Sequence, residues 1–208
     1  MRSYEFDELN SSKSRAIPYE KYFGEMELTE KQKEDRIKAS KQIESMMLFL
    51  FSLLSVMKEY SYQNVEFVVT QVKTQYSNII SSNAVMDDYL IGYVQEFSEQ
   101  IVETTQEHFE DEWYLSDDRA IFVAENEANT TFNYLEYKKA VKSGKTKKRW
   151  VTMRDRHVRH THQLVDGKSI GINDVFLVGD SEMFYPKDTT FGASANEIVN
   201  CRCSIKYF

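Results

Sequence analysis

The sequence predicts an α+β protein, with a helical N-terminal region followed by a small C-terminal α+β module that contains short antiparallel strands. The 208 residues include only 2 Pro and 7 Gly, and this scarcity of helix breakers favours long helices. Apolar residues recur at helical spacing in the first two thirds of the chain, whereas short β-branched and aromatic segments follow Gly144. We therefore expect an N-terminal arm over residues 1–28, a helical region over 29–144 and the α+β module over 145–208.

The first long helix is expected from Thr29 to about Tyr60. Residues 1–28 are polar and contain Pro18 and Gly24, which predicts an extended or partly ordered arm. Thr29 is followed three residues later by Gln32, the capping-box pattern of a helix start. The apolar stripe beyond it packs either inside this chain or against another chain, and the intramolecular core is the simpler interpretation. The stripe consists of Ile43, Met46, Met47, Leu50, Leu53, Leu54 and Met57.

Three further helices complete the predicted helical region. Residues 65–80 and 89–109 carry apolar positions at spacings of three and four. Ser116, Asp117 and Asp118 offer N-cap chemistry for a last helix that ends near Gly144. Its inward face is expected to contain Ala120, Val123, Ala124, Ala128, Thr131 and Leu135.

The predicted module combines strands over residues 150–153, 174–178 and 198–206 with a short His-rich helix.

Positive charge is concentrated at the end of the last predicted helix and at the start of the module. The whole chain carries −7, yet residues 138–160 contain ten Lys or Arg against one acid, a net +9, which leaves −16 for the rest. Such a segment could hold a polyanion such as DNA, or it could be a solvated helix end and hairpin. The residues expected to contact DNA are Lys145, Lys147, Lys148 and Arg149.

The only two cysteines, Cys201 and Cys203, are separated by one residue. In an extended strand their side chains point to opposite faces, which disfavours both a disulfide and a shared metal. Together with His162 they are nevertheless weak zinc candidates, since thiolate and imidazole suit that metal. We expect no cofactor, with zinc as the less favoured alternative. The segment Met1–Glu8 is charged and no long apolar stretch follows, so we expect no secretory leader.

Polar links are the favoured role for the motif residues of the module. Asp155 could cap the His-rich helix, Arg159 could pair with Asp166 or Glu197, and Gly167 could end the helix at positive φ. A catalytic alternative would use His162 and Asp166 as a general-base pair. A phosphate-binding loop is excluded, because the first glycine of that motif would fall on Lys139.

The same segment resembles the phage Mu F-like, or SPP1-type, minor head protein family. The resemblance covers residues 115–208 and rests on an ordered set of short motifs. Those motifs contain Lys148 with Trp150, Thr152, Asp155, Arg159 with His162, Asp166 with Gly167, Pro186, and the run Asn200, Cys201, Arg202 and Cys203.

This resemblance implies a minor capsid protein inside the head of a tailed bacteriophage, acting in head morphogenesis and genome delivery. The partners it implies are the portal protein, the major capsid or scaffold protein and double-stranded DNA, with no membrane involved during assembly. The protein would lie in the virion interior, and in the host cytoplasm during assembly. We expect no enzymatic activity. The alternative is a metal-dependent enzyme or toxin-like effector that uses the His/Cys constellation.

Overall fold

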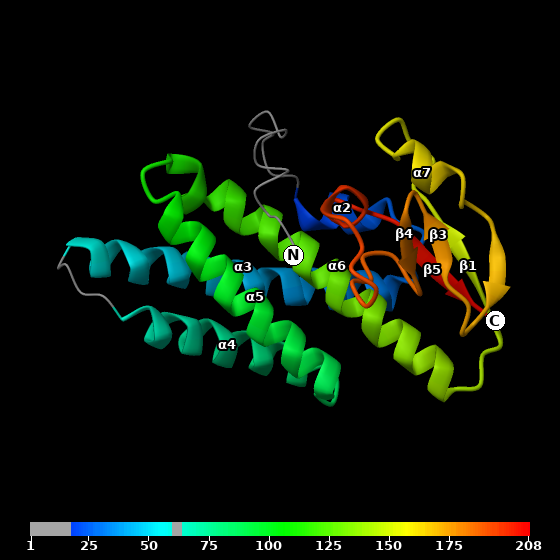
Figure 1. Ribbon diagram of the computed structural model, residues 1–208, viewed down its shortest axis with the longest axis horizontal. Coiled ribbons are helices and arrows are strands. Elements are labelled where there is room, and N and C mark those ends of the chain that lie inside the picture. Colours follow the sequence, from blue (N-terminus) through cyan, green and yellow to red (C-terminus); the bar gives the residue numbers. More distant parts are fainter. Residues whose placement is uncertain (1–17, 60–63) are drawn as a thin grey trace. The chain divides into compact units, whose positions relative to one another are not determined.

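The computed structural model describes residues 18–59 and 64–208, which form two compact units (Figure 1). One unit contains residues 38–127 and is helical. The other contains residues 18–37 together with residues 128–208, and it combines helix ends with all the described strands. The α+β class predicted from the sequence is confirmed. None of the helices in the described part of the chain has the length and apolarity that a bilayer span needs.

The helical unit is built from α3 (Glu30–Glu59), α4 (Val65–Ser81), α5 (Asp88–Glu107), the 3₁₀ helix η1 (Glu112–Leu115) and α6 (Asp117–Lys142), of which α3 and α6 extend into the other unit. Each helix prediction is confirmed to within two or three residues. Side chains cap the starts as their types predict: Asn64 accepts from the N–H of Phe67 and Asp87 from that of Leu90. The capping box also forms, since Thr29 and Gln32 each accept a hydrogen bond from the other's backbone N–H.

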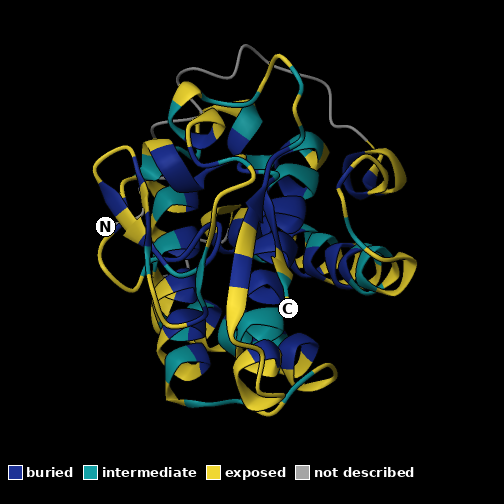
Figure 2. Ribbon diagram, turned by 90° about the vertical axis from the view of Figure 1, so that its right-hand side faces the viewer, coloured by how far each residue is buried: buried dark blue, intermediate teal, exposed yellow. Residues whose placement is uncertain are grey.

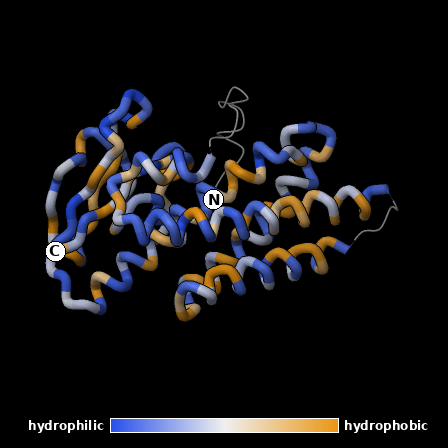
Figure 3. The backbone as a smooth tube through the Cα atoms, turned by 180° about the vertical axis from the view of Figure 1, so that it is seen from behind, coloured by the Kyte–Doolittle hydropathy of each residue, from blue (hydrophilic) through white to orange (hydrophobic). Residues whose placement is uncertain are grey.

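The apolar stripe of α3 packs inside the helical unit, as the simpler interpretation expected. Met46, Met47 and Leu50 are at most 1% exposed, whereas Phe49 lies on the other side and is 44% exposed. Figure 2 shows the resulting division of the helices into buried and exposed faces, and Figure 3 shows hydrophobic positions recurring along them. Deep in this unit the carboxylate of Glu127 accepts hydrogen bonds from the hydroxyls of Tyr76 (2.9 Å) and Tyr93 (2.6 Å).

The second unit begins with a helix that the sequence analysis did not anticipate. Residues 1–17 of the expected arm lie outside the described residues, but α2 (Tyr19–Gly24) forms within it. Pro18 stands just before this helix, where its fixed φ is tolerated, and so does not interrupt it. Tyr19, Tyr22 and Phe23 are buried, which gives the short helix its stability.

The strands of this unit form two antiparallel sheets. The larger sheet has the order β2 (Ser169–Gly171), β1 (Lys147–Val151), β5 (Ser204–Tyr207), and the smaller pairs β3 (Phe176–Val178) with β4 (Ser181–Met183). The short helices α7 (His160–Gln163) and α8 (Ala195–Ile198) lie between strands in the chain. The His-rich helix was predicted. The last strand is shorter than the predicted 198–206, because α8 ends at Ile198 and residues 199–203 are irregular.

Strand β1 starts at Lys147, three residues earlier than predicted. The prediction missed these residues because buried and exposed positions alternate along a run of cations, where the sequence shows no alternation of apolar and polar residues. Lys147 and Arg149 are exposed, while Lys148 and Trp150 are 0% exposed. The Nζ of Lys148 has no hydrogen-bond partner among the described residues and lies 4.9–5.6 Å from the ring centres of Tyr137, Phe176 and Phe184. Burial lowers the pKa of Lys148 to about 8, although Asp188 and Asp174 oppose that shift.

Replacing this buried amine with an apolar chain should stabilise the protein. Between pH 8 and the ordinary pKa of 10.5, Lys148 is protonated in the unfolded chain but not in the folded one. The destabilisation that Lys148 causes in the folded protein therefore decreases as the pH rises through this range. Lys148→Met should therefore raise the free energy of unfolding at pH 7 by about 1–3 kcal/mol, less whatever the cation–π contacts contribute. The gain should shrink towards pH 10. Urea unfolding at both pH values measures it.

The matched control is Lys147→Met, on the exposed side of the same strand, which should change stability by no more than about 0.5 kcal/mol. Destabilisation by Lys148→Met, or a gain that is the same at both pH values, would contradict this account of Lys148.

Candidate functional site

The three weak zinc candidates come together in the second unit. The sulfurs of Cys201 and Cys203 and a ring nitrogen of His162 all lie within 4.8 Å of one another. His162 Nδ1 is 3.3 Å from the sulfur of Cys203 and 3.6 Å from that of Cys201. All three side chains are at most 3% exposed. The cluster is therefore a buried group of possible metal ligands drawn from α7 and from the segment before β5.

The expectation that the two cysteine side chains point apart was wrong. It assumed an extended strand, but both cysteines precede β5, and Asn200 just before them has a φ of +55°. The N–H of Cys201 bonds back to the carbonyl of Ile198, which turns the chain at this point. Because the segment is not extended, alternation does not apply and both thiols reach the same imidazole.

The second ring nitrogen of His162, Nε2, is held by a carboxylate. Its Nε2 lies 2.9 Å from Oε2 of Glu197, and the hydroxyl of Thr161 donates to the same oxygen at 2.8 Å. The pair of His162 with Asp166, which the catalytic alternative would use, does not form: Asp166 bonds to Thr152 and Arg154 instead. Glu197 therefore fixes the ring so that Nε2 carries a proton and Nδ1 faces the thiols.

Charge within the cluster is unevenly shared. Burial raises the pKa of Cys201, but hydrogen bonds from Cys203 and His162 outweigh it and hold that pKa well below its ordinary value. The hydrogen bond to Cys201, together with burial, raises the pKa of Cys203. Burial opposes a charge on His162, yet Cys201 raises the pKa of His162 overall. The cluster thus favours one thiolate beside an imidazolium when no metal is present.

Trp150 closes the cluster from the sheet. Its ring meets the rings of His162 and Phe176 edge-on, with centroids 5.8 and 5.2 Å apart. The indole N–H of Trp150 acts to lower the pKa of Cys203. It is not positioned to form a hydrogen bond with the Cys203 sulfur. The motif residue Trp150 therefore packs against the His/Cys cluster and helps to bury it.

The remaining motif residues make polar links, partly with other partners than expected. Asp155 accepts from the N–H of His157 and pairs with Arg202 at 2.5 Å. Asp166 forms an ion pair with Arg154 at 2.9 Å, and not the expected pair with Arg159. It also accepts a hydrogen bond from the backbone N–H of Thr152. These bonds hold the pKa of Asp155 and of Asp166 below the ordinary value even though burial opposes the shift.

Arg159 contributes in two ways. Its guanidinium donates to the carbonyl of Val199 at 2.5 Å, next to the cysteine segment, and it forms no ion pair with an acid in the described part of the chain. It also stands at the N-cap position of α7, where Asp155 was expected. Gly167 has the expected positive φ, +74°, but it does not end the helix, because α7 stops at Gln163 and has Leu164 as its C-cap.

The predicted DNA-contacting residues divide into two groups. Lys145, Lys147 and Arg149 are exposed, whereas Lys148 is buried among aromatic rings and cannot reach a phosphate without unfolding. Arg149 lies opposite Lys206 in the register of β1 and β5. Lys206 is exposed too and pairs with Glu27. We call Lys145, Lys147, Arg149 and Lys206 the basic face of the sheet.

Sequence reasoning missed Lys206 and the role of Glu197. Lys206 follows the predicted strand's alternation but lies far along the chain from the basic segment, so only the strand register brings it there. From the sequence, Glu197 is expected only as a partner of Arg159, and no signal singles out Thr161. For Glu197 the available signal is its place four residues before Cys201, but such a spacing is not specific.

Comparison with known proteins agrees with the motif-based resemblance. Residues 95–206 match the family described as phage Mu protein F like protein. A segment of 90 residues is 34% identical to NAD(+)–arginine ADP-ribosyltransferase EFV of Enterococcus faecalis (strain ATCC 700802 / V583), covering 41% of this chain and 18% of that protein. The chain thus spans less than a fifth of that relative's length. No solved structure matches significantly. Because the family match covers more than half of the chain, the protein belongs to the phage Mu protein F-like family of head-related phage proteins.

Proposed function

We propose that this protein is a minor capsid protein of a tailed bacteriophage that lies inside the head and acts in head morphogenesis and genome delivery. Family membership supports the phage head as its setting. The proposed partners are the portal protein, the inner shell of major capsid or scaffold protein, and packaged double-stranded DNA. The protein would reach the virion interior from the host cytoplasm, where heads assemble.

The basic face of the sheet is the observation that carries the DNA-binding part of this proposal. Lys147 and Arg149 project from the exposed side of β1, and Lys145 precedes the strand. No ion pair is formed by these three side chains within the described part of the chain, although Arg149 donates to the hydroxyl of Ser169. Unpaired cations on an exposed sheet attract a phosphate backbone and release its counterions.

Two further exposed lysines extend this surface along the chain. Lys139 and Lys142 stand in the last turn of α6, directly before the turn that leads into β1. Cations at a helix C-terminus are favoured by the helix dipole, which explains their place without DNA. They nevertheless add to the positive field around Lys145, so binding should depend on charge and not on base sequence.

The DNA contact is tested with the triple variant Lys145→Gln, Lys147→Gln and Arg149→Gln. We expect weaker binding to double-stranded DNA, with the slope of log K against log salt reduced by about 2–3. Fluorescence anisotropy over a salt series measures both. The triple Lys31→Gln, Lys38→Gln and Lys58→Gln removes the same charge from exposed positions on α3 and should leave the slope nearly unchanged. Equal slopes for both triples would rule out the basic face.

The location in the head is tested by quantitative mass spectrometry of purified particles. We expect the protein in DNA-filled heads at far fewer copies than the major capsid protein, protected from protease until the heads are opened. Its absence from filled heads, or its digestion on intact heads, would refute a place in the interior.

The alternative is an effector with enzymatic activity. The 34% identical relative is named as an arginine ADP-ribosyltransferase, which is the observation in its favour. Against it, His162, Cys201 and Cys203 are at most 3% exposed, so a substrate could reach them only after a rearrangement. Transfer of ADP-ribose from NAD(+) to an arginine substrate by the purified chain would support the effector over the head protein.

A further inference from the structure

We propose that His162, Cys201 and Cys203 bind a zinc ion, through Nδ1 of the imidazole and the two sulfurs. This inference is independent of the proposed head function. It rests on the convergence of three buried donor atoms, on the groups that orient them, and on the fit of the donor set to one metal.

The two distances from the imidazole nitrogen to the sulfurs match those of a tetrahedral zinc site. Zn–S bonds of about 2.3 Å and Zn–N bonds of about 2.0 Å place a nitrogen and a sulfur ligand about 3.5 Å apart. Nδ1 of His162 lies 3.3 and 3.6 Å from the sulfurs of Cys203 and Cys201. All three donor atoms also fall within 4.8 Å of one another, so a metal could be accepted with small side-chain shifts.

The imidazole is oriented for metal binding by its surroundings. Glu197 accepts from Nε2 at 2.9 Å and is itself held by Thr161, so the ring is oriented with Nδ1 towards the two sulfurs. A carboxylate behind a ligating histidine is a common arrangement in zinc sites, since it fixes the tautomer and makes the ligand more basic. A catalytic pair of His162 with Glu197 would leave the two thiols without a role. A zinc site gives a role to the imidazole, the carboxylate and both thiols.

The cysteine segment is also fixed from outside the cluster. Asn129 on α6 donates to the carbonyl of Cys201 at 3.0 Å, and Arg159 donates to that of Val199. Arg202, between the two cysteines, is held by Asp155. A loop that is held by three such bonds keeps its sulfurs in place before a metal arrives, which lowers the cost of binding.

The chemistry of the donor set suits zinc and excludes the common hard cations. Two thiolates and an imidazole are soft to intermediate ligands that exclude calcium and magnesium, which prefer oxygen. Three protein ligands leave a fourth position, which a water molecule or another exogenous group can take. Binding would release the protons that the cluster holds on its donor atoms and would join α7 to the segment before β5, so the metal would stabilise the module.

The test is the metal content of the full chain, purified without chelator, reduced, and equilibrated with zinc. After removal of free metal, elemental analysis should find about one zinc per chain. Cobalt in its place should give the thiolate-to-metal charge-transfer band and the strong visible bands of a tetrahedral site. Cys203→Ser and His162→Asn should lose most of the zinc, and Glu197→Gln should weaken affinity about 10–100-fold.

Matched controls are His157→Asn and His160→Asn, which alter exposed histidines beside or within α7 and should keep full zinc content. If the cysteine variants do not fold, thiol modification of the wild-type chain replaces them, and zinc should be released in step with the two thiols. A reduced wild-type chain with less than about one tenth of an equivalent of zinc would overturn the proposal. So would full zinc in folded Cys203→Ser, or two thiols found oxidised to a disulfide in the fresh protein.

Discussion

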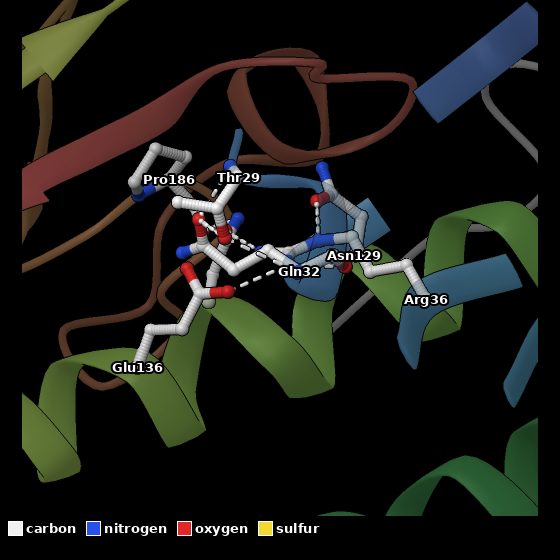
Figure 4. Close-up of polar contacts among 7 residues, drawn as sticks. Thr29, Gln32, Arg36, Asn129, Glu136 and Pro186 are labelled. Atoms are coloured by element: carbon white, nitrogen blue, oxygen red, sulfur yellow. Dashed lines mark hydrogen bonds and ion pairs between the residues drawn. The ribbon is translucent and has the colours of Figure 1, made fainter. Parts of the chain in front are cut away.

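A buried polar ladder along α6 is the interaction on which the second unit depends. Asn129 and Asn133 lie one helical turn apart on α6. The side-chain oxygen of Asn129 accepts a hydrogen bond from the guanidinium of Arg36 at 3.2 Å (Figure 4), and that of Asn133 accepts one from the same guanidinium at 3.1 Å. The side-chain nitrogen of Asn129 donates to the carbonyl of Cys201, and that of Asn133 to the carbonyl of Pro186. Glu136, one turn further, completes an ion pair with Arg36 at 2.5 Å. Each asparagine thus links the start of α3 to a loop of the C-terminal module.

The ladder explains how a module with short strands can hold a precise cluster of side chains. Its apolar core includes the buried side chains of Trp150, Phe176 and Met183. Its loops between strands would be loosely placed by that core alone. Hydrogen bonds to buried carbonyls supply the missing constraint, because leaving those carbonyls unpaired would cost about 1–3 kcal/mol each. The position of the cysteine segment, and with it the His/Cys cluster, follows from Asn129 and Arg159 rather than from regular secondary structure.

The helices were predictable from the sequence because their signals are local. Thr29 with Gln32, Asn64 and Asp87 cap helices as their types indicate, and the apolar stripe of α3 is buried as its spacing predicts. The buried polar face of α6 was not predictable, because Asn129 and Asn133 look like ordinary surface residues until their distant partners are known. Likewise, Lys148 looked like one of a run of exposed cations, and only the strand register shows that it points inward. The cysteine sulfurs were placed wrongly because a strand was extended through Cys201 and Cys203, where Asn200 at positive φ instead turns the chain.

The central claim, that the ladder fixes the second unit, is tested most directly by the free energy of unfolding of Arg36→Met in urea. Arg36 is 0% exposed, so the substitution would leave Glu136 and two asparagine oxygens without their main donor. The account predicts a loss of about 3–5 kcal/mol, against about 0.5 kcal/mol or less for Lys31→Met at an exposed position of the same helix. A loss for Arg36→Met no larger than that of Lys31→Met would contradict it.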